Sequence, residues 1–326
     1  MAKLKSSVVV CTIPPDFKPS GKVAANDSIW HTREHVDAVA KTATGKGISI
    51  CIGDTGGTDA SQYLPEPAGA IDYTGSRHGW RDVQGHGAHC AGSSLGNSGL
   101  SFSPDAAYYI AKGLGDSGSG SDEALAKGIV WAADQGCHIY SGSWGSSSRS
   151  QRVADAIKYF YANGGLICNI AAGNSGFRRG ANTVGWPARL EGDDSPFSIA
   201  ALRGSSWSNL ERADFSSVGP QNDAAAPGQN IRSVKTGTRS SLTDMSGTSM
   251  ATPVKTSIDA CVLEVMIGHG YGIPKTVEDW FSFYAKIPNA IIDLGSQGTD
   301  DFHGAGALNT LAIIEWLAEG SEHSWI

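Results

Sequence analysis

Three residue types that together can activate a hydroxyl nucleophile occur in glycine-rich segments of this 326-residue chain. Asp54 lies in Gly-Asp-Thr-Gly, His86 in Gly-His-Gly-Ala-His, and Ser249 in Gly-Thr-Ser-Met-Ala-Thr-Pro. A serine hydroxyl is a weak nucleophile until a base takes its proton, and a carboxylate can orient an imidazole for that task. A lone Gly-Thr-Ser would fit a helix cap equally well. Together, the three segments predict a nucleophile at Ser249, a base at His86 and an orienting acid at Asp54.

The elements that must position these residues alternate between short apolar strands and amphipathic helices. Apolar runs predict strands at 48–53, 108–111, 137–140, 166–171 and 197–201. Helical spacing of apolar residues predicts helices over 122–135, with Asp122 as N-cap, and over 150–163. Such alternation indicates a parallel sheet covered on both faces. Ligands bind beyond the carboxyl ends of such strands, which is where Asp54 and Asn174 fall.

Composition excludes several classes of function. The net charge is −7 and no run of lysine or arginine is present, so a nucleic-acid partner is not expected. No apolar stretch is long enough to span a membrane. The apolar run near the start is too short for a secretory signal, so we expect a cytoplasmic protein, with a trimmed secreted form left open. The six cysteines are scattered, which favours buried free thiols, and no linker divides the chain.

An ordered series of motifs resembles the subtilases, the subtilisin-like serine proteases. The series is GDTGG at 53–57, GHGAHCAG at 85–92, SWG at 143–145, AAGNSG at 171–176, TVGWPA at 183–188, FSSVGP at 215–220, APG at 226–228 and SGTSMATP at 246–253. The resemblance implies a three-layer α/β fold, with a mainly parallel sheet and helices on both faces. It also implies a serine endopeptidase that acts on polypeptides through an acyl-enzyme and needs no cofactor for its chemistry.

The resemblance assigns further roles around the triad. The side-chain amide of Asn174 would stabilise the oxyanion, together with the backbone N–H of Ser249, although a turn asparagine is the alternative. His89 would be structural. An extended peptide would lie between two segments, Gly118-Ser119-Gly120 and Ser143-Trp144-Gly145. The pocket for the side chain before the scissile bond would be lined by Ser143, Trp144, Gly145, Ala171, Ala172, Gly173 and Gly185. None of these is acidic, so a large or apolar side chain is expected there. Trp144 stands where a smaller aliphatic residue is usual, which leaves the pocket width open.

Two features depart from the family pattern after and around the catalytic segments. Lys255 and Asp259 lie four residues apart on the predicted helix that follows Ser249, where they either face solvent or form a buried pair. The loop at 92–104 contains no carboxylate, so the strong calcium site of subtilisins is not expected, and calcium remains possible only as a structural ion at unknown sites. Cys90 beside His86 resembles proteinase K and offers a thiol where mercurials or oxidation would disturb the triad.

The start of the chain resembles intracellular subtilisins. Thr12-Ile13-Pro14-Pro15 is similar to an Ile-Pro element in their short N-terminal extension, which occludes the active site. We therefore expect residues 1–20 to form an inhibitory extension, as in a zymogen, and residues 21–326 to form the peptidase domain. A disordered tail is the alternative. The alternative for the whole chain is a catalytically silent subtilase-fold protein that binds peptides. Only the two charges after Ser249 favour this silent alternative. A serine endopeptidase is therefore the preferred interpretation.

Overall fold

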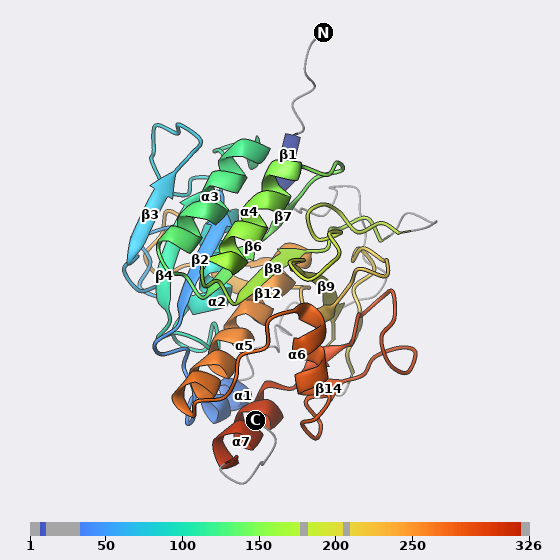
Figure 1. Ribbon diagram of the computed structural model, residues 1–326. Coiled ribbons are helices and arrows are strands. Elements are labelled where there is room, and N and C mark those ends of the chain that lie inside the picture. The colour runs from blue at the N-terminus through green and yellow to red at the C-terminus, as the bar shows by residue number, and fades with distance from the viewer. Residues whose placement is uncertain (1–6, 11–32, 177–181, 205–208, 321–326) are drawn as a thin grey trace.

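The computed structural model describes residues 7–10, 33–176, 182–204 and 209–320 (Figure 1). Its helices are α1 (Arg33–Val39), α2 (His86–Leu95), α3 (Asp122–Asp134), α4 (Gln151–Ala162), α5 (Thr248–Gly268), α6 (Val277–Tyr284) and α7 (Thr310–Glu319). Its strands are β1 (Ser7–Val10), β2 (Ser49–Asp54), β3 (Gly69–Asp72), β4 (Ala107–Lys112), β5 (Ser119–Ser121), β6 (Ile139–Gly142), β7 (Trp144–Gly145), β8 (Ile167–Ala171), β9 (Phe197–Arg203), β10 (Glu211–Arg212), β11 (Ala224–Pro227), β12 (Ile231–Val234), β13 (Leu242–Met245), β14 (Ile291–Ile292) and β15 (Ala307–Leu308).

A mainly parallel sheet organises the described chain. Its strand order is β14-β15-β11-β9-β8-β6-β2-β4-β3, with β10 pairing β9 at the side. All neighbours from β3 through to β15 run parallel, whereas β14 and β10 pair antiparallel. The carboxyl ends of β2, β6 and β8 therefore meet at one edge of the sheet. This arrangement brings the segments that follow Asp54, Gly142 and Ala171 together.

Helices cover both faces of the sheet, as the sequence predicts. Side chains alternate along the strands, so that Ile50 and Ile52 join one apolar core with α2 and α5, whereas Cys51 joins a second core with α3 and α4. Figure 1 shows α3 and α4 side by side across the second face. Both cores are continuous over several strands. The three-layer α/β prediction is confirmed.

The predicted elements differ from the observed ones mainly at their ends. The N-cap of α3 is Ser121 rather than Asp122, because the Ser121 side chain accepts from the Ala124 backbone N–H and has extended dihedral angles. Asp122 is instead the first helical residue, where its carboxylate interacts favourably with the positive end of the helix dipole. The strand predicted at 137–140 begins two residues later, at Ile139. Cys137 is instead buried against the second core.

The five described cysteines are all buried free thiols: Cys51, Cys90, Cys137, Cys168 and Cys261. Burial raises the pKa of the Cys168 and Cys261 thiols well above their ordinary value. They therefore pack as small hydrophobic side chains. Among the described helices, none combines the length and the apolar character that crossing a membrane requires.

Candidate active site

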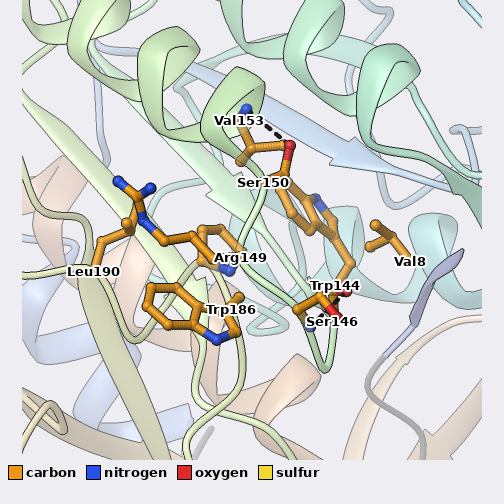
Figure 2. A pocket seen from close by; sticks show the side chains of 10 residues that line it. Val8, Trp144, Ser146, Arg149, Ser150, Val153, Trp186 and Leu190 are labelled. Carbon is orange, nitrogen blue, oxygen red and sulfur yellow. Dashed lines mark hydrogen bonds between the residues drawn. The ribbon is translucent and has the colours of Figure 1, made fainter. Parts of the chain in front are cut away.

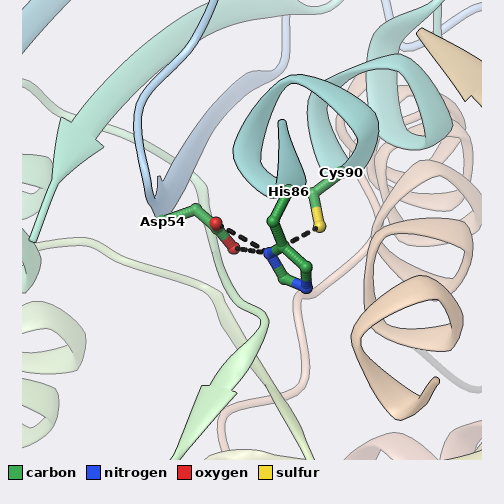
Figure 3. A group of neighbouring side chains, drawn as sticks. All are labelled: Asp54, His86 and Cys90. Carbon is green, nitrogen blue, oxygen red and sulfur yellow. Dashed lines mark hydrogen bonds and ion pairs between the residues drawn. The ribbon is translucent and has the colours of Figure 1, made fainter. Parts of the chain in front are cut away.

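Asp54 and His86 form a buried pair at the carboxyl edge of the sheet (Figure 3). Asp54 ends β2 and is fully buried, and His86 begins α2 and is 4% exposed. The His86 Nδ1 lies 2.8 Å from Asp54 Oδ1 and 3.0 Å from Oδ2. Burial alone would lower the pKa of His86, but the attraction of Asp54, supported by the neighbouring Cys90, is stronger and raises that pKa well above its ordinary value. The pair can thus stabilise a protonated imidazole.

The loop before His86 is held by a second carboxylate. Asp82 accepts hydrogen bonds from the Thr55 hydroxyl and from the backbone N–H groups of Gln84, Gly85 and Ala88. Gly85 precedes the helix with φ 106°, a left-handed conformation that favours glycine. These contacts fix the ring of His86 over the end of β2.

Ser249 occupies the first turn of α5, and the residue four positions later cannot donate a hydrogen bond to its carbonyl. Pro253 lies four residues later and has no N–H to give. The Ser143 hydroxyl donates to that carbonyl instead, at 2.8 Å, and the Cys90 thiol lies 3.5 Å from it. The Ser249 hydroxyl in turn donates to the Ser143 carbonyl at 3.0 Å. Ser143 therefore holds both the backbone carbonyl and the side-chain hydroxyl of Ser249, the proposed nucleophile.

The imidazole and the serine are neighbours in space. The Cys90 Sγ lies 3.8 Å from His86 Nδ1 and 3.5 Å from the Ser249 carbonyl oxygen, so one side chain touches both residues. The other ring nitrogen of His86, Nε2, is buried and makes no hydrogen bond within the described residues. In this structure the Ser249 hydroxyl is turned to Ser143. Resting geometry of this kind is common where the catalytic hydrogen bond forms only with substrate.

Asn174 is held by the residue that precedes Ser249. It lies three residues beyond β8, and its Oδ1 accepts from the Thr248 N–H at 2.9 Å and from the Thr248 hydroxyl at 3.1 Å. The Thr248 Oγ1 also accepts from the Gly173 N–H at 3.1 Å. Because Thr248 engages the amide oxygen, the orientation of the Asn174 side chain is fixed relative to the first turn of α5. Thr248 thus holds the Asn174 amide in place. The sequence reasoning assigned no role to Thr248, although it lies within the SGTSMATP motif at 246–253.

The two predicted substrate segments hold an extended strand of the chain itself. β1 lies between β5 and β7 and is antiparallel to both, with Val8 opposite Gly120, Val9 opposite Ser119 and Gly145, and Val10 opposite Trp144. Val8 is 2% exposed and lies beside the Trp144 ring in a pocket that includes Val153 and Trp186 (Figure 2). Gly118 precedes β5. The Ile-Pro element at 12–15 lies outside the described residues.

The residues predicted to line the pocket before the scissile bond lie on adjoining segments. Ser143 precedes β7, which contains Trp144 and Gly145, while Ala171 ends the neighbouring β8 and Ala172 and Gly173 follow it. Gly185 donates from its N–H to the Ala172 carbonyl at 2.9 Å. Trp144 is almost fully buried and turns toward Val8 and Val153. The Trp144 side chain therefore forms part of the wall of the pocket that Val8 of β1 occupies.

Several other ionisable residues near the site have structural roles. His89 is buried, and its Nε2 lies 2.9 Å from the Ile231 carbonyl oxygen. Asp59 pairs with Arg81 at 2.6 Å on the surface. Asp116, in the loop before β5, pairs with the buried Lys112 at 3.0 Å, and Lys112 also donates to the Thr55 carbonyl. Lys112 thus ties the catalytic turn to the substrate segment, a role that the sequence reasoning missed.

The charges after Ser249 form a buried pair. The Lys255 Nζ lies 2.8 Å from both carboxylate oxygens of Asp259, and both side chains are excluded from solvent. Of the two alternatives open in the sequence, the buried pair is the correct one. Because the pair is internal to the fold, it does not alter the surface on which a peptide would bind.

Metal-type ligands come together only at the proposed catalytic centre, as far as the described residues extend. Asp54, His86 and Cys90 each offer one ligand atom, and these atoms lie within 4.8 Å of one another. The thiolate and imidazole types suit a soft ion better than calcium, which prefers oxygen. Calcium as a structural ion therefore stays a prediction of the sequence.

A carboxylate, an imidazole and a hydroxyl at one edge of an α/β sheet, with an amide beside them, define a serine-hydrolase type of centre. A model of the subtilase family matches residues 45–306, and the chain belongs to that family. It is 38% identical over 222 residues to a thermostable alkaline protease of Halalkalibacterium halodurans, covering 67% of this chain and 57% of that protein. It is 35% identical over 224 residues to Subtilisin DY of Bacillus licheniformis, covering 67% and 78%. The chain thus spans little more than half of the first of these relatives.

Proposed function

We propose that this chain hydrolyses peptide bonds of extended polypeptides, with Ser249 as nucleophile and His86 as general base. The observation that carries the proposal is the buried Asp54–His86 pair, which Cys90 joins to Ser249 at the start of α5 and whose Nε2 has no hydrogen-bond partner among the described residues. Asp54 holds the imidazole so that Nε2 is free to accept a proton. The Ser249 hydroxyl turns from the Ser143 carbonyl to Nε2 as a substrate enters.

The reaction follows from the positions of the groups. The Ser249 oxygen attacks the carbonyl carbon while its proton passes to His86, and the Asn174 NH₂ and the Ser249 N–H receive the negative oxygen. The protonated His86 then gives the proton to the leaving amine, which leaves an acyl-enzyme that water hydrolyses. We propose a large or apolar side chain before the scissile bond, since the adjoining wall residues carry no acid.

A serine-directed phosphonylating reagent tests this function against the silent, peptide-binding alternative. We expect covalent labelling at Ser249, located by mass spectrometry, and no labelling in the His86→Ala variant. A matched control is Ser257→Ala, which removes another buried serine hydroxyl of α5 and should label normally. Binding of peptide without labelling of Ser249 would instead favour the silent protein.

We also propose that β1 inhibits the enzyme by taking the place of a substrate strand. The support is its antiparallel pairing with both substrate segments and the burial of Val8 against Trp144. A substrate held in the same way would place a β-branched or medium-sized apolar side chain opposite Gly120. Cleavage that removes residues 1–20 would then activate a zymogen, and a cytoplasmic location stays part of this proposal.

The Val8→Asp variant of the full chain should release β1, because a carboxylate cannot be buried in this apolar pocket without a large cost. We expect the initial rate of peptide cleavage to rise by about 10-fold or more, since burial of a valine is worth about 1.5–3 kcal/mol. Val8→Ile keeps the apolar contact and should remain inhibited. Mass spectrometry must show that the first residues are intact in each sample. Equal rates in intact wild type and intact Val8→Asp would refute the inhibition.

A further inference from the structure

A row of threonine hydroxyls runs along α5 from Thr248, the neighbour of Ser249, into the core. The Thr256 hydroxyl donates to the Thr252 carbonyl at 3.0 Å, and the Thr252 hydroxyl donates to the Thr248 carbonyl at 2.9 Å. All three threonines are completely buried. Because they are spaced by four residues, they share the face of α5 that ends at Asn174. The helix itself satisfies the Thr252 and Thr256 hydroxyls, so any role of the row beyond α5 depends on the groups bonded at its two ends.

The inner end of the row is bonded to Asn169, a buried amide in the middle of β8. Its Nδ2 donates to the Thr256 hydroxyl at 3.0 Å and to Asp259 Oδ2 at 2.7 Å, while its Oδ1 lies 3.4 Å from Lys255 Nζ. The cation and the carboxylate together leave only one orientation for this amide. Lys255 also lies 4.2 Å from the centre of the Phe197 ring on β9. The ion pair therefore anchors α5 to two strands.

The same helix and strand meet again at the active site. β8 leads to Asn174, and α5 begins at Thr248, whose N–H and hydroxyl hold the amide of Asn174. Apolar contacts between a helix and a sheet are non-directional and allow small sliding movements. Directed hydrogen bonds fix the register of two elements, which is the best-attested use of buried polar groups. The Asn169–Thr256 contact and the Asn174–Thr248 contact therefore both connect α5 to β8 or to the segment that follows β8.

We propose that Asn169, Thr256 and the Lys255–Asp259 pair are positioning residues, which fix the register of α5 on β8 and thereby aim the Asn174 amide at the oxyanion. This rests on the proposed function, in which Asn174 is the oxyanion donor. The geometry of such a donor is demanding, since small misplacements in a catalytic site can lower a rate by about 100-fold. The register bonds act through Asn174 and do not touch the substrate.

Thr256→Val and Thr256→Ser separate positioning from packing. Valine keeps the shape of threonine and deletes the hydroxyl, whereas serine keeps the hydroxyl and deletes a methyl group. We expect Thr256→Val to lower kcat by about 10-fold with KM nearly unchanged, and Thr256→Ser to stay within about 2-fold of wild type. Asn169→Leu, which removes the same bond from the side of β8, provides a second variant if Thr256→Val does not fold. Ser257→Ala is the control, because its hydroxyl lies outside the row.

A double-mutant cycle with Asn174→Ala completes the test. If the row acts through Asn174, Thr256→Val causes no further loss of kcat in the Asn174→Ala background. Equal loss in both backgrounds, or a larger defect in Thr256→Ser than in Thr256→Val, would overturn the positioning role and leave the proposed function intact. An Asn174→Ala variant as active as wild type would instead overturn the oxyanion role itself, and the positioning proposal with it.

Discussion

The Asp54→Asn variant should lose about 10⁴-fold in kcat/KM while keeping its fold, as loss of the acid does in other serine proteases with this triad. The Asp54 carboxylate accepts from His86 Nδ1 at 2.8 Å, which leaves Nε2 without a proton and able to act as a base. An asparagine amide can donate to Nδ1 instead, and the proton then moves to Nε2. The imidazole would still lie in place, but in the wrong tautomer. Steady-state cleavage of a peptide substrate measures the loss.

The pH profile gives an independent measure of the same pair. Activity needs a neutral His86, so kcat/KM rises as the pH passes upward through the pKa of this residue. That pKa lies well above its ordinary value, because the attraction of Asp54 outweighs the opposing effect of burial. Asp54→Asn removes the attraction of the carboxylate and leaves the opposing effect of burial, so the midpoint of the residual activity should move to lower pH. Asp59→Asn, at a surface pair with Arg81, should change neither the rate nor the midpoint. A residual activity above a tenth of wild type would contradict the assignment of Asp54.

Much of the site was predictable because its residues lie at the ends of recognisable elements. Asp54 ends an apolar strand and Asn174 follows another, so a parallel sheet brings them to one edge. The family motifs added Ser249 and its neighbours. The cap of α3 was misplaced by one residue, because Ser121 and Asp122 are both good caps and only the backbone conformation separates them.

The remaining features depend on contacts between residues that are distant in the sequence. Lys112 and Thr55 meet because β2 and β4 are neighbours, and no local pattern reports that contact. Asn169 did carry a signal, since a polar residue interrupts the apolar run of β8. The partner of such a residue cannot be identified without the register of the helix that covers it. The same reason left Lys255 and Asp259 unassigned between solvent and core.

The Asp259→Ala variant should lower the free energy of unfolding by about 3–5 kcal/mol, the usual cost of removing one partner of a buried ion pair. Lys255 would be left in the core without its anion, and one donated bond of Asn169 would lose its acceptor. Urea unfolding measures the change. Each variant is built on Ser249→Ala, so that cleavage of unfolded molecules by folded ones does not distort the transition.

Replacing both partners separates the charge from the packing. Lys255→Met with Asp259→Leu removes both charges at similar volume, and such replacements are often neutral in stability. Asn169 would keep its bond to the Thr256 hydroxyl and lose its acceptor at Asp259, as in Asp259→Ala, and its oxygen would also lose Lys255, which costs about 1–3 kcal/mol more. The double variant should therefore be more stable than Asp259→Ala. A double variant no more stable than the single one would mean that the ion pair itself supports the fold. The double variant can also be made with Ser249 present, so that its kcat is measured. If it is stable but its kcat is low, the ion pair serves to fix the position of α5. The pair would then contribute to catalysis rather than to stability, despite the cost of desolvating its two charges.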